Sequence, residues 1–135
     1  MPLHPAEEAT IRAFIVRDKS ERYLSILANE KRRGKFLDCL NHCRDFDTRF
    51  ATEIASSLNV VSLLQAHGAP AECNLLSNIK SLDGRDLLLT EAVEEVDFVG
   101  FGTLICCIPG DLALYVDEAG TGRRLLLERS SDKKR

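Results

Sequence analysis

The sequence predicts an α+β fold, in which a helical N-terminal half packs on a small antiparallel sheet of three or four strands from the C-terminal half. Apolar residues recur at helical spacing through about residue 66, and short apolar runs separated by turn residues follow. The length of 135 residues suits one compact domain. We expect this domain to cover residues 1–129, with a disordered, charged tail at residues 130–135.

Two helices are expected at the N-terminus. Pro5 begins the first, over residues 5–16, because proline needs no amide partner in the first turn of a helix. Asp18 and Glu21 have the spacing of a capping box, which predicts the start of a second helix over residues 19–28.

Two more helices complete the predicted helical half. A one-face apolar stripe predicts a third helix that ends near Arg44. A fourth is expected over residues 58–66, with Gly68 as its C-terminal glycine. Residues 45–52 show no clean period and are interpreted as a connection. The stripe of the third helix consists of Phe36, Leu37, Leu40 and Cys43.

The second half has strand-like patterns. Residues 73–76 form a short apolar run, and Asp83-Gly84 predicts a tight turn because glycine supplies a positive φ. Thr90 is placed to cap a short acidic helix over residues 91–96. Three later apolar runs, with turn residues between them, predict an antiparallel meander of three strands. The run at residues 73–76 extends this sheet to four strands. The three runs are residues 103–108, 112–116 and 125–127.

The predicted strand at residues 104–108 is apolar on both sides. A strand with one face in water alternates apolar and polar residues, so this one needs cover on both faces. Two explanations remain open at this point. The helices of the same chain wrap around the sheet, or a second copy covers it and the protein is a homodimer.

Charge is unevenly distributed along the chain. Residues 1–50 carry ten Lys/Arg and eight Asp/Glu, residues 51–120 carry two and eleven, and residues 121–135 carry six and two. The net charge of -3 therefore combines basic ends with an acidic middle. Such a division predicts attraction between the parts of the chain, or two faces of opposite sign for a partner.

The cysteines and the apolar runs indicate the compartment. Five cysteines, with Cys106 and Cys107 adjacent, argue against a disulfide framework, and free thiols of this kind commonly pack in cores in a reducing compartment. No apolar run reaches the roughly 20 residues of a membrane helix. The N-terminus also lacks the pattern of a secretory signal. We therefore expect a cytoplasmic protein.

The sequence predicts no metal and no cofactor. Cys39, His42 and Cys43 have metal-ligand spacing, but zinc takes four protein ligands, or three and a water, and one helix supplies three at most. Whether these three residues share a site stays open. Phosphate-binding loops, dinucleotide fingerprints, nucleophile elbows and paired Cys-x-x-Cys motifs are absent. No catalytic residue is assigned.

Two charged segments carry the candidate binding residues. The first is the predicted turn, because charged loops on a rigid scaffold commonly bind ligands. The second is a basic run at the start of a helix, where it opposes the positive end of the helix dipole. It therefore calls for an anionic neighbour, either phosphate or the protein's own acidic half. The residues are Asp83, Arg85 and Asp86 in the turn, and Lys31, Arg32, Arg33 and Lys35 in the basic run.

These features favour a non-enzymatic protein-interaction or regulatory module that binds another protein or a second copy of itself. The sequence does not identify the partner. One alternative is a small hydrolase or transferase that uses the carboxylates between Asp83 and Glu91, with Arg85 holding an anion. The other is nucleic-acid binding through residues 31–35, which the pI of 5.6 and the absence of Trp disfavour. No pattern identifies a small-molecule ligand.

Overall fold

The computed structural model describes residues 4–29, 31–40, 43–55, 59–99, 102–117 and 123–129, and of residues 97–99 it describes the backbone only. The α+β class is confirmed, with five helices and six strands in these residues. None of the helices in the described ranges combines the length and the apolar character that crossing a membrane requires. The predicted tail at residues 130–135 lies outside the described residues.

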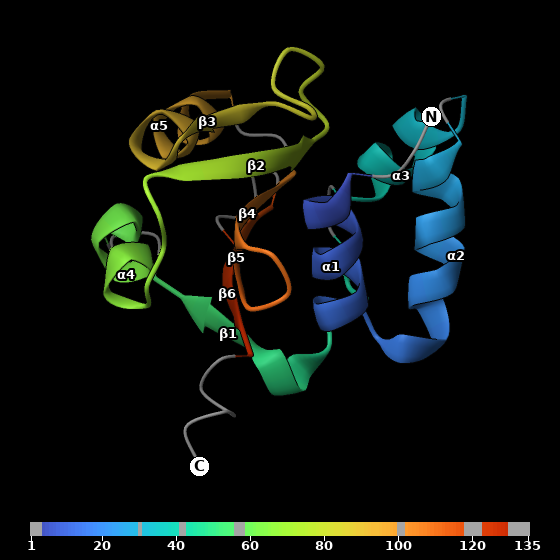
Figure 1. The fold of residues 1–135 in the computed structure, drawn as a ribbon, viewed down its shortest axis with the longest axis horizontal. Coiled ribbons are helices and arrows are strands. Elements are labelled where there is room, and N and C mark those ends of the chain that lie inside the picture. The colour runs from blue at the N-terminus through green and yellow to red at the C-terminus, as the bar shows by residue number, and fades with distance from the viewer. Residues whose placement is uncertain are drawn as a thin grey trace.

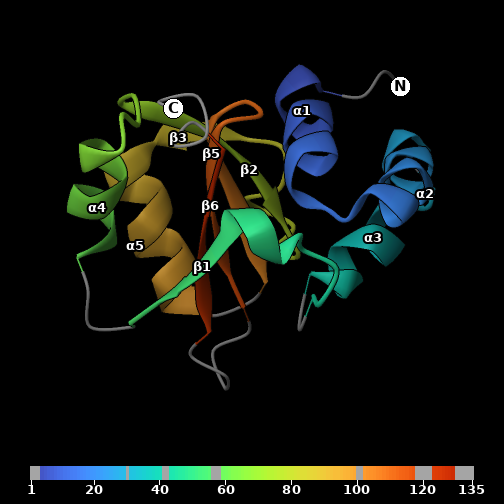
Figure 2. The ribbon, with the colours of Figure 1, turned by 90° about the horizontal axis from the view of Figure 1, so that it is seen from below.

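The sheet has six strands rather than the expected three or four. All neighbouring strands are antiparallel, in the order β1-β6-β5-β4-β2-β3. Figure 1 shows the sheet between two groups of helices, and Figure 2 shows α1, α2 and α3 on one side and α4 and α5 on the other. The strands are β1 (Ala51–Ile54), β2 (Glu72–Ser77), β3 (Asp86–Leu88), β4 (Thr103–Ile108), β5 (Leu112–Val116) and β6 (Arg124–Glu128).

The two edge strands, β1 and β3, are not predicted by the sequence patterns. β1 lies within and beyond the segment interpreted as a connection, and it pairs with β6, with Ala51 opposite Leu127. β3 is three residues long and pairs with β2 alone. A short edge strand pairs on one side and stays half exposed, so it carries little of the apolar pattern that marks a central strand.

The first two helices are α1 (Pro5–Phe14) and α2 (Arg17–Ala28). Pro5 begins α1 as predicted, after His4, whose Nδ1 accepts a hydrogen bond from the Ala6 amide at 3.0 Å. The predicted capping box is wrong, because α2 begins after Val16 and already contains Asp18 in its first turn. A β-bridge between Ile15 and Phe46 holds the chain just before this point, and the second helix starts directly after it.

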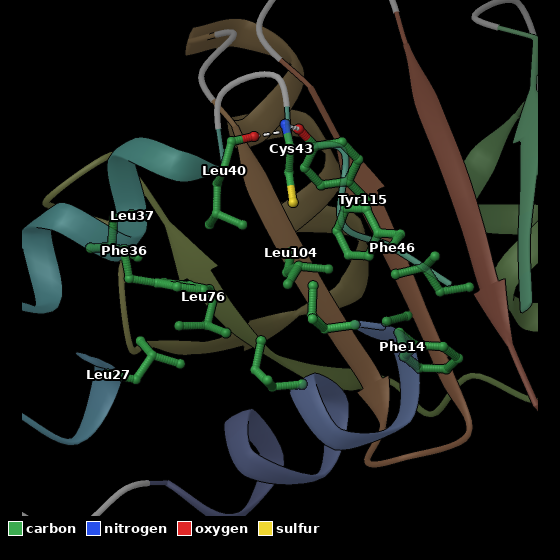
Figure 3. Packing of buried hydrophobic residues seen from close by; sticks show 14 of the residues in the cluster. Phe14, Leu27, Phe36, Leu37, Leu40, Cys43, Phe46, Leu76, Leu104 and Tyr115 are labelled. Atoms are coloured by element: carbon green, nitrogen blue, oxygen red, sulfur yellow. Dashed lines mark hydrogen bonds between the residues drawn. The ribbon is translucent and has the colours of Figure 1, made fainter. Parts of the chain in front are cut away.

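The third helix, α3 (Arg33–Cys39), ends earlier than the apolar stripe predicts. Tyr115 of β5 explains the difference, as Figure 3 shows. Its hydroxyl donates to the carbonyl oxygen of Leu40 and accepts a hydrogen bond from the amide of Cys43 at 3.0 Å. These bonds tie Leu40, the residue that follows the helix, and Cys43 to β5. The stripe thus predicted correctly that Phe36, Leu40 and Cys43 are buried, although it did not mark where the helix ends.

The other face of the sheet carries α4 (Val60–Ala66) and α5 (Leu89–Val99). Gly68 follows α4 with a φ of 99°, which confirms the predicted C-terminal glycine. Gly84 has a φ of 78°, which confirms the turn at Asp83-Gly84. Thr90 lies inside α5 instead of capping it, because the helix begins at Leu89.

Both faces of the sheet are covered within the chain. Along β5, Ala113 and Tyr115 pack with the helices α1 to α3, whereas Leu112, Leu114 and Val116 pack with α4 and α5. This double cover explains why the central strands do not alternate between apolar and polar residues. A homodimer through the sheet requires that one face of β4 is not covered by the chain itself. In the structure, α4 and α5 cover that face. Self-association therefore needs a different surface.

Candidate functional site

Arg33, from the predicted basic run, points into the protein and binds two carboxylates. It donates to Glu7 of α1 through Nη1 at 3.1 Å and Nη2 at 2.7 Å, and to Asp83 of the β2–β3 turn through Nε at 2.7 Å and Nη2 at 3.1 Å. The side chain of Glu7 is 3% exposed and that of Asp83 is 13% exposed. For Arg33, the expected anionic neighbour is therefore the protein itself.

This ionic cluster joins three parts of the fold. Hydrogen bonds from Glu7 first, and from Asp83 second, raise the pKa of Arg33. Oδ1 of Asp83 also accepts a hydrogen bond from the backbone amide of Ser77 at 3.1 Å. The cluster thus holds α1 and α3 against the β2–β3 turn, which is a structural role. The other members of the basic run, Lys31, Arg32 and Lys35, are exposed and form no ion pair with described residues.

The acids predicted for an enzymatic site are not brought together. Asp83 belongs to the ionic cluster, and Asp86 accepts a hydrogen bond from Asn74 Nδ2 at 3.0 Å. Arg85 and Glu91 do share a surface hollow of about 360 Å³, with Glu94 and Glu95 of α5. Neither Asp83 nor Asp86 lines that hollow, so the predicted set of carboxylates does not form one site.

The thiols are separated in the same way. Cys39 is exposed at the end of α3, and Cys43 is buried in the core, while His42 lies outside the described residues. Burial raises the pKa of Cys73 and that of Cys106 to about 12. Within the described residues, no group of three or more His, Cys, Asp or Glu side chains is placed to hold a metal ion.

A cleft of about 560 Å³ opens where α1, α2, the 3-10 turn η1 (Thr48–Phe50) and the end of β6 meet. We call it the arginine cleft. Four of its side chains are arginines from separate parts of the chain, and two are acids. The charged side chains are Arg12, Arg17, Arg49, Arg129, Glu21 and Asp47, which give the cleft a formal charge of +2.

Phe50 helps to position two of these arginines. The guanidinium carbon of Arg129 lies 4.1 Å from the centre of the Phe50 ring, and that of Arg49 lies 5.0 Å from it. Both distances are typical of cation–π contacts. Arg129 Nη1 also donates to the carbonyl oxygen of Ala13 at 3.3 Å. The ring and the end of α1 therefore hold two cationic side chains at one wall of the cleft.

Two of the four arginines have carboxylate partners. Arg12 donates to Glu8 at 3.0 Å and to Glu21 at 2.5 Å, and hydrogen bonds to Glu21 and then Glu8 raise its pKa. Arg49 pairs with Asp47 at 2.7 Å, and this hydrogen bond lowers the pKa of Asp47.

The other two arginines have no such partner. Arg17 and Arg129 form no ion pair with any carboxylate in the described part of the chain, and Arg17 is exposed. Arg129 interacts with Asp47 only at longer range, because that carboxylate is hydrogen-bonded to Arg49. Two guanidinium groups that donate to no carboxylate favour an anionic ligand, because an arginine can bind a carboxylate or a phosphate through two parallel hydrogen bonds.

Sequence reasoning missed this cleft because its arginines are far apart in the chain. Positions 12, 17, 49 and 129 share no motif, and they meet only because β1 pairs with β6 and η1 precedes β1. The one available signal was the excess of basic residues at both ends of the chain. In the sequence this excess is densest at residues 31–35, which do not line the cleft.

Comparisons with known proteins give no relative: no family model, no curated protein and no solved structure matches this chain.

Proposed function

We propose that the chain is a non-enzymatic protein-interaction module that binds an acidic segment of a partner protein in the arginine cleft. The observation that carries this proposal is that Arg17 and Arg129 line one cleft and neither forms an ion pair with a carboxylate of the described residues. The remaining arginines, Arg12 and Arg49, are already paired with carboxylates, so the positive field of the site comes from Arg17 and Arg129.

The rest of the surface supports charge-based binding. Leu88, at 45% exposure, is the one exposed large apolar side chain among the described residues, so a broad apolar docking patch is absent from them. The acidic body would repel the long phosphate backbone of a nucleic acid. A short acidic peptide segment needs only the local field of the cleft.

The proposal is tested by fluorescence anisotropy with a labelled peptide of glutamate and serine residues, and with the phosphoserine version of that peptide. We expect both to bind at low salt and to weaken as salt screens the charges. Arg17→Gln with Arg129→Gln should weaken binding by about tenfold, because the loss of two ion pairs at a partly exposed site has roughly that effect.

The matched control is Arg22→Gln with Arg32→Gln, which removes the same charge from exposed positions that do not line the cleft. This control should bind as the wild type does. A glutamine version of the peptide should not bind. Equal binding by both double variants, or no binding by the wild type, would overturn the proposal. Tighter binding of a DNA duplex than of either peptide would also overturn it, in favour of nucleic acid.

A further inference from the structure

We infer that the acidic segment taken by the arginine cleft is helix α5 of a second copy of this chain, so that the protein associates head to tail. This inference rests on the proposed function, since it names the occupant of the same cleft. Its basis is the charge and the placement of two surfaces of one molecule.

The first part of the argument is the complementary charge of α5. Glu91, Glu94 and Glu95 are exposed on this helix, and no ion pair joins them to described residues. Glu91 and Glu95 are four positions apart and therefore lie on one side of the helix. With Arg85 beside them, the surface has a formal charge of -2, against +2 in the cleft. A helix with exposed glutamates presents carboxylates to the guanidinium groups of Arg17 and Arg129.

The second part is the position of the two surfaces at opposite ends of the sheet. The arginine cleft includes η1, which leads directly into β1, one edge strand. The glutamates face the turn and strand around β3, the other edge strand. Figure 1 shows β3 and α5 at the top, and the connection from α1 to α2 at the bottom. One chain therefore cannot place its own α5 in its own cleft, whereas the α5 of a second copy is free to reach it.

Such a contact joins two different patches, so it leaves one free cleft and one free α5 on every pair. Repetition then produces a closed ring or an open chain of copies. Because the contact depends on exposed charges, association should be favoured at low salt and reversed by added salt. This surface is different from the faces of the sheet, which the helices of the same chain already cover.

Sedimentation velocity with the 135-residue chain tests the inference through two variants that each remove one side of the contact. The cleft variant is Arg17→Gln with Arg129→Gln, and the face variant is Glu91→Gln with Glu95→Gln. We expect wild-type protein to form species larger than a monomer at low salt and to return to the monomer at high salt. Each variant alone should be monomeric. An equimolar mixture of the two should form a one-to-one dimer and nothing larger, since only one intact contact can form.

Control variants with the same change of charge are Arg22→Gln with Arg32→Gln, and Asp38→Asn with Glu72→Gln, all at exposed positions outside both surfaces. They should associate as the wild type does. A wild type that stays monomeric at low salt, a face variant that still associates, or a mixture without dimer would overturn the inference.

Peptide binding to the face variant separates the two proposals. If the peptide binds in its cleft but no dimer forms, only the second copy is wrong; if no peptide binds, the function of the cleft is wrong as well.

Discussion

Arg33 and Asp83, fifty residues apart in the sequence, share two hydrogen bonds of 2.7 and 3.1 Å, and the same guanidinium binds the buried carboxylate of Glu7. The pairing links the N-terminal helices to the β2–β3 turn. It also shows how the basic first part of the chain and its acidic middle neutralise each other inside the fold.

Replacing Arg33 tests the importance of this cluster for stability. Arg33→Ala should lower the free energy of unfolding by about 3 kcal/mol, because it leaves two carboxylates without their cation in a largely buried site. Urea unfolding measures the change. Arg32→Ala, at the exposed neighbouring position, is the control and should change stability little. Similar losses in the two variants would show that the cluster does not stabilise the fold.

Tyr115 offers a second test, at the end of α3. Tyr115→Phe removes the hydroxyl between the Leu40 carbonyl and the Cys43 amide, which should cost about 1–2 kcal/mol because two buried backbone groups lose their partner. Thermal unfolding followed by circular dichroism provides the measurement. Tyr23→Phe is the comparison, and its effect should be smaller, since Asp45 keeps its ion pair with Lys19 and contact with water. The reverse order of the two effects would contradict this account of where α3 ends.

Phe50 should affect peptide binding through the arginines that it positions. Phe50→Leu keeps an apolar side chain but loses the ring under Arg49 and Arg129, so the affinity for the acidic peptide should fall by about threefold, the equivalent of one exposed cation–π contact. Phe50→Tyr retains an aromatic ring and should keep the affinity. If the leucine variant binds like the wild type, the ring does not organise the cleft.

The thiols should react in two classes. Cys39 is exposed and should react rapidly with a thiol reagent at mildly alkaline pH, whereas the other four cysteines are buried. Burial raises the pKa of Cys43 to about 11 and that of Cys73 and Cys106 to about 12, so little thiolate is present in the folded protein. Cys39→Ser should remove the fast phase. A second fast thiol in the folded protein would contradict the packing described above.

A lysine in the central strand distinguishes core from interface. Ile105 of β4 is fully buried on the face that α4 and α5 cover, so Ile105→Lys should unfold the chain, because an unpaired charge would enter the core. Circular dichroism and sedimentation together check this. A folded, monomeric Ile105→Lys protein would show instead that this face of the sheet is a contact between copies.

The sequence by itself determined the elements whose signals are local. Strands β4 and β5 have the bounds that their apolar runs predict, and Pro5, Gly68 and Gly84 stand where their backbone preferences require. In each case, the residues that carry the signal are the residues that form the element. The apolar character of residues 104–108 also showed that both faces of the sheet need cover.

Tertiary structure decided what depends on distant partners. Edge strand β1 forms because β6 is available to pair with it, and α3 ends early because Tyr115 binds the backbone at Leu40 and Cys43. The same holds for charges. Arg33 is neutralised inside the fold by Glu7 and Asp83, whereas Arg17 and Arg129, far apart in the sequence, line one cleft and form no ion pair with described carboxylates. A charge interacts across space with whatever the fold brings near it, so its partner cannot be inferred from its neighbours in the chain.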